Sequence, residues 1–99
     1  MTVDELLRSV ENDSTPPDGL SPELESLWHT KADNWEAAHN IAQEIHTPMG
    51  SWIHAHLHVI EGDLGNAAYW YRKADRPTPT PPDGLDDEWR ELVDAALNM

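Results

Sequence analysis

The chain has 99 residues, and its 19 Asp and Glu against 6 Lys and Arg give a formal net charge of −13. That length fits one domain with a single modest core. The charge excludes nucleic acid and anionic membranes as expected partners, because both require clustered cations. The lack of cysteine excludes disulfide bonds, thiolate catalysis and zinc bound by cysteine.

The N-terminal segment predicts a short helix rather than a targeting sequence. Thr2 and Glu5 have the spacing of a capping box. The segment is acidic and lacks the basic start and the apolar stretch of a signal peptide. The chain also contains no run of the roughly 18 apolar residues that a transmembrane helix needs. We therefore expect a cytoplasmic protein.

Residues 21–46 are predicted to form an antiparallel hairpin of two helices. Ser21 and Pro22 are typical of a helix start, with a hydroxyl cap and a proline at the first helical position. Asp33 and Glu36 have the spacing of a second capping box, which predicts that the chain turns just before them.

Residues 48–75 predict a second hairpin. Pro48 ends the preceding helix and begins the next, with Thr47 as its cap. Gly62 is a typical helix C-terminus, and Asp63 can cap the helix that follows.

The C-terminal part combines a proline-rich strap with one more helix. Residues 76–84 contain too much proline for a helix and are predicted to be extended. Residues 86–98 have the cleanest amphipathic pattern of the chain. Its apolar positions are Trp89, Leu92, Val93, Ala96 and Leu97.

The two hairpins show a partial repeat at an offset of thirty residues. The offset is near the roughly 34-residue period of tetratricopeptide hairpins, and it places Tyr69 at the position of His39. Residues 1–99 are thus predicted to be one all-α domain, a compact bundle of five to six helices, whose first and last helices cap its two ends. The matched positions are Leu27, Ala32-Asp33 and Ala37-Ala38 with Leu57, Gly62-Asp63 and Ala67-Ala68.

The block from Trp52 to Ala74, together with Trp35-Glu-Ala-Ala-His39, resembles a family of short bacterial and fungal proteins of uncharacterised function. Their pattern is W-I-H-A-x-L-H-x-x-E-G-D-x-x-N-A-x-Y-W-Y-R-R-A, and Lys73 stands here at its second arginine. The match covers about the middle half of the chain. The resemblance implies a helical fold and brings no activity with it.

Three of the six histidines lie in the segment Ile53-His-Ala-His-Leu-His58, on two faces of the predicted helix. His56 falls on the apolar face and is expected to be buried and hydrogen-bonded to a neighbour. His54 and His58 are four residues apart on the other face, and Glu61 follows one turn later.

This second face suggests a metal site. Two imidazoles and a carboxylate from His54, His58 and Glu61 can bind one divalent ion, with His39 as a further ligand from the preceding helix. Zinc and nickel are the expected ions, because imidazole suits both. Histidines that are solvated, or hydrogen-bonded within the fold, are the alternative. A hydrolase-like activity would depend on such a metal, and no other cofactor is expected.

The same face also predicts a shallow polar and aromatic groove. The alternative is that Trp70 and Tyr71 fill the core while Asn66 assists a helix cap. No catalytic motif is present, so we expect a non-catalytic interaction module that binds a protein or peptide, with a homodimer also open. The predicted groove residues are His39, His54, His58, Glu61, Asn66 and Tyr69.

Overall fold

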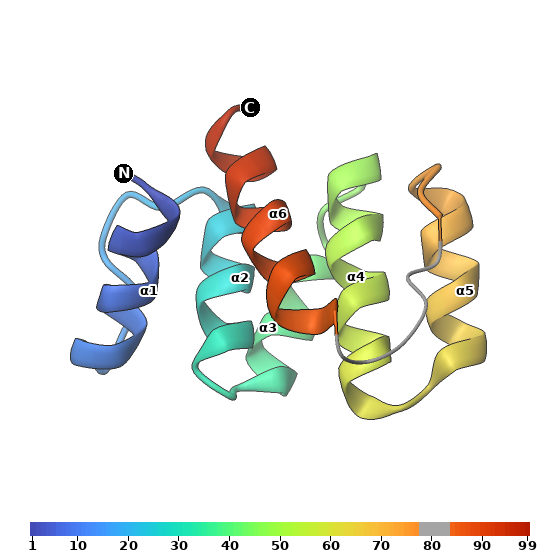
Figure 1. The fold of residues 1–99 in the computed structure, drawn as a ribbon, viewed down its shortest axis with the longest axis horizontal. Coiled ribbons are helices and arrows are strands. Elements are labelled where there is room, and N and C mark those ends of the chain that lie inside the picture. The colour runs from blue at the N-terminus through green and yellow to red at the C-terminus, as the bar shows by residue number, and fades with distance from the viewer. Residues whose placement is uncertain (78–83) are drawn as a thin grey trace.

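The computed structural model describes residues 1–77 and 84–99, which form six α-helices and contain no strand (Figure 1). The all-α prediction is confirmed, and the Cα radius of gyration of 12.4 Å is that of a compact domain of this length. None of the helices in the described ranges has the length and apolar content needed to cross a bilayer. The helices are α1 (Val3–Asn12), α2 (Pro22–Lys31), α3 (Trp35–Ala42), α4 (Pro48–Glu61), α5 (Leu64–Lys73) and α6 (Leu85–Leu97).

Most of the predicted helix ends are confirmed. Thr2 and Glu5 form both hydrogen bonds of a capping box at α1. The side chains of Thr47 and Asp63 accept hydrogen bonds from backbone N–H groups at the starts of α4 and α5. Gly62 ends α4 in the left-handed conformation, with φ of 87°. Local capping chemistry therefore fixes both ends of α4, the helix that carries three of the histidines.

The turn of the first hairpin differs from the prediction. Asp33 does not cap α3: it takes the left-handed conformation, with φ of 64°, and Asn34 is the N-cap without a side-chain hydrogen bond. Asp and Asn tolerate this conformation better than most residues. The predicted capping box from Asp33 to Glu36 is therefore wrong.

This turn also corrects the register of the repeat. The left-handed residues Asp33 and Gly62, and the helix caps that follow them, correspond at an offset of 29 residues rather than thirty. The fully buried Ala38 and Ala67 have the same offset. His39 consequently corresponds to Ala68, not to Tyr69.

The C-terminal helix lies in a different place from the one predicted. It does not cap an end of the bundle but crosses α2 and α4 and packs against both (Figure 1). The reason is the apolar face of α6, where Trp89 is buried and donates its indole N–H to the carbonyl of Leu27 at 2.9 Å. Helix α1 packs on α2 and α6, and α5 packs on α4. Of the predicted strap, residues 78–83 lie outside the described residues.

Candidate metal centre

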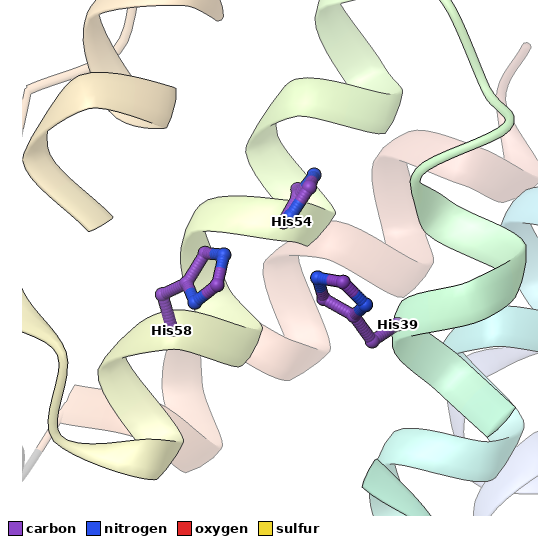
Figure 2. Close-up of side chains that lie close together, drawn as sticks. All are labelled: His39, His54 and His58. Carbon is purple, nitrogen blue, oxygen red and sulfur yellow. The ribbon is translucent and has the colours of Figure 1, made fainter. Parts of the chain in front are cut away.

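Three imidazoles meet where the two hairpins join. His39 comes from α3, and His54 and His58 come from successive turns of α4 (Figure 2). One ring nitrogen from each lies within 4.8 Å of the other two. The ring centroids of His39 are 4.5 Å from His54 and 5.4 Å from His58, and those of His54 and His58 are 4.7 Å apart. We call these residues the histidine cluster.

Two tryptophans enclose the cluster. Trp70 of α5 stacks on His54 with ring centroids 4.0 Å apart, and Trp35 of α3 stacks on His39 at 4.7 Å. Trp35 also donates its indole N–H to the carbonyl of Leu57 at 2.7 Å, which fixes α3 against α4. As a result, only 6% of His54 and 5% of His58 is exposed.

Burial keeps two of these imidazoles neutral. Desolvation, followed by the nearby His39 and His58, lowers the pKa of His54 from 6.5 to about 4. Desolvation and His58 also lower the pKa of His39, although Glu61 acts in the opposite direction. Both rings are therefore unprotonated near neutral pH, the form in which imidazole donates a lone pair to a metal.

Glu61 supports the cluster from outside. Its carboxylate accepts a hydrogen bond from Nδ1 of His58 at 2.6 Å, so that Nε2 is the nitrogen left to bind a ligand. In metal sites a carboxylate in this position fixes the tautomer and the orientation of a histidine ligand. The sequence suggested Glu61 as a metal ligand with His39 as a further one. The structure places His39 with His54 and His58, and it places Glu61 with His58 and the exposed Asp63 in a second group whose ligand atoms lie within 4.8 Å of one another.

The other three residues of the predicted groove are more exposed than the imidazoles. His54 and His58 are buried and His39 is half-buried, but three members of the groove are exposed at the surface. The interaction groove therefore stays a prediction. The exposed members are Glu61, Asn66 and Tyr69.

His56 belongs to a separate polar cluster on the side of α4 that faces α6. It is 2% exposed and its Nδ1 lies 2.5 Å from Glu88, which confirms the prediction of a buried, hydrogen-bonded histidine. Glu88 also accepts hydrogen bonds from the hydroxyl of Tyr71 at 2.7 Å and from the indole of Trp52 at 3.3 Å. Glu88 was not predicted from the sequence, although it lies one helical turn before Leu92 and thus on the inner face of its helix.

Comparison with protein-family models, with curated proteins and with solved structures gives no match for this chain. The likeness to tetratricopeptide hairpins and the family resemblance of the central block therefore stay predictions.

Proposed function

We propose that this protein binds one divalent transition-metal ion through His39, His54 and His58. The observation that carries the proposal is the approach of three imidazole nitrogens, from two helices, to within 4.8 Å of one another. Imidazole is a good ligand for zinc, nickel and copper. Small side-chain rotations would bring the nitrogens to the roughly 2.0–2.1 Å that a zinc–nitrogen bond requires.

The surroundings of the cluster favour metal binding in two ways. His54 and His39 have lowered pKa values, so binding near neutral pH does not have to displace a proton from either ring. The hydrogen bond from His58 to Glu61 holds the third ring in one tautomer. Three protein ligands leave one position of a tetrahedral ion open, the arrangement of exchange-competent rather than purely structural zinc sites.

The packing of His54 also suits a metal ligand. Only 6% of the residue is exposed, and its ring lies between Trp70 and the other two imidazoles.

Isothermal titration calorimetry with zinc and nickel tests the proposal. We expect one ion per chain, and we expect His54→Leu or His39→Leu to weaken binding by roughly 100-fold or more, because each removes a ligand. His29→Gln is the matched control, since His29 lies on α2 outside the cluster. Circular dichroism establishes that each variant is folded.

Two results would overturn the proposal. One is the absence of binding by the folded wild-type protein. The other is an unchanged affinity in the double variant His54→Leu, His58→Leu. The interaction-module role and a homodimer stay predictions from the sequence.

A further inference from the structure

A cavity of about 480 Å³ lies beside the histidine cluster. Its walls come from the connection between α3 and α4, from the first turn of α4, and from α5. His54 and Trp70, which stack on each other, form part of the lining. The volume falls within the range of about 300–1,000 Å³ that is usual for small-molecule sites.

His54 connects the cavity to the proposed metal site. It belongs to the histidine cluster and it lines the cavity. Only 6% of the residue is exposed. An ion bound to His54 would therefore lie beside the cavity, within reach of a ligand that occupies it.

The charges around the cavity favour an anion. Lys73 lines it and holds its ammonium group 5.1 Å from the centroid of the Trp70 ring. The N-terminus of α4, which begins at Pro48, also lines the cavity and carries the positive end of the helix dipole. A cation and a helix N-terminus on one cavity are notable in a chain with a net charge of −13.

The rest of the lining is mixed: Gln43, His46, Thr47 and Ser51 are polar, and the other residues provide an apolar part that can cover the body of a ligand. Ala42, Ile45 and Pro48 line the cavity together with the indole of Trp70. A free inorganic anion would leave this surface uncovered. An organic acid with an apolar body of a few carbon atoms would cover it, and burial of apolar area would add to the affinity.

We propose that the cavity binds a small organic acid, whose carboxylate completes the coordination of the metal near Lys73 while its apolar body lies against Trp70. This inference rests on the proposed metal function. It extends that function from an ion held by three histidines to a metal-dependent binding site for a carboxylate ligand.

Cobalt(II) bound to the full chain gives the test, because its visible absorption reports changes in its coordination. Acetate, benzoate and inorganic phosphate are titrated into the cobalt-bound protein. We expect saturable spectral changes with both carboxylates, and about tenfold tighter binding of benzoate than of acetate because of its apolar ring. Lys73→Met should weaken benzoate binding about tenfold and leave the cobalt affinity unchanged. Arg72→Met, the same loss of charge on a neighbouring residue outside the cavity lining, should leave both affinities unchanged.

The remaining outcomes distinguish failure of the metal site from failure of the organic-acid site. If the folded protein shows no cobalt spectrum that depends on His54, the metal function fails and this inference fails with it. If cobalt binds but benzoate does not change the spectrum, or binds Lys73→Met equally well, the metal function stands and the acid site is overturned. If phosphate binds as tightly as benzoate, the inference that the ligand has an apolar organic body is overturned.

Discussion

The imidazole of His54 lies face to face with the indole of Trp70, with ring centroids 4.0 Å apart and planes inclined by 17°. This stack joins α4 to α5 and removes one face of the imidazole from water. The protonated form of His54 is disfavoured by this burial and by two further imidazoles beside it. The same packing of His54 that favours metal binding should therefore make the fold less stable at acidic pH.

Stability should consequently fall at mildly acidic pH. The pKa of His54 is about 4 in the folded protein, against 6.5 in the unfolded chain, so the unfolded chain binds the extra proton between these two values. The free energy of unfolding should decrease as the pH falls from 6.5 towards 4, by up to about 3 kcal/mol from this residue, with no further loss from it at lower pH. Urea unfolding of the metal-free protein at several pH values measures the change.

His54→Leu is the matched variant for this measurement, because it keeps an apolar side chain against Trp70 and removes the titrating group. Its stability should depend less on pH across the same window, with a smaller remaining slope from His39, whose pKa is also lowered. An equally steep dependence in His54→Leu and in the wild type would show that the acid sensitivity arises elsewhere.

Glu61→Gln should weaken metal binding without unfolding the protein. The change removes the charge that holds Nδ1 of His58, and such outer carboxylates contribute about 10- to 100-fold to metal affinity. The side chain of Glu61 is 36% exposed, so the free energy of unfolding should change by no more than about 0.5 kcal/mol. Zinc titration by calorimetry gives the affinity, with Glu11→Gln on α1 as the control of equal charge change. Equal zinc affinities in the two variants would show that Glu61 does not contribute to metal binding.

The elements of this fold were predictable where their signals are local. Thr47 and Pro48 at one end of α4, and Gly62 and Asp63 at the other, act through hydrogen bonds and backbone conformations within a few residues. The turn at Asp33 was misassigned because an aspartate suits both an N-cap and a left-handed residue, and the sequence does not distinguish the two.

The candidate site was predictable only in part. Helical spacing places His54 and His58 on one face of α4, but it does not show which helix that face contacts. The approach of His39 depends on how α3 packs against α4, which Trp35 fixes through its contact with Leu57. Glu88 was missed for a similar reason, because α6 was expected at an end of the bundle rather than across α2 and α4.

Glu88→Gln should destabilise the fold strongly. The side chain of Glu88 is only 10% exposed. Burial raises its pKa, but hydrogen bonds from His56, Tyr71 and Trp52 outweigh this and keep the pKa below its usual value. The glutamine amide can accept only some of these hydrogen bonds. Loss of the interactions between a buried charged group and its partners costs about 3 kcal/mol. Urea unfolding measures the loss.

The control for Glu88→Gln is Asp87→Asn, which makes the same change at an exposed neighbour in the first turn of α6. It should change the free energy of unfolding by about 0.5 kcal/mol or less. If Glu88→Gln were equally mild, α6 would not be held on α4 by this buried cluster.

Gly50→Ala and Gly65→Ala should shift stability in opposite directions. A Cβ atom on Gly50 would overlap the carbonyl oxygen of Ile45 and lie 2.7 Å from its Cβ, so the start of α4 and the preceding connection would have to separate. We expect a loss of about 1–3 kcal/mol.

A Cβ atom on Gly65, within α5, meets no atom within 4 Å, and alanine should stabilise this helix by about 0.5–1 kcal/mol. Thermal and urea unfolding of both variants give the signs. Because Gly50 also lines the cavity, a stable Gly50→Ala protein would mean that the connection and α4 do not approach this closely, and that the cavity beside His54 has a different shape.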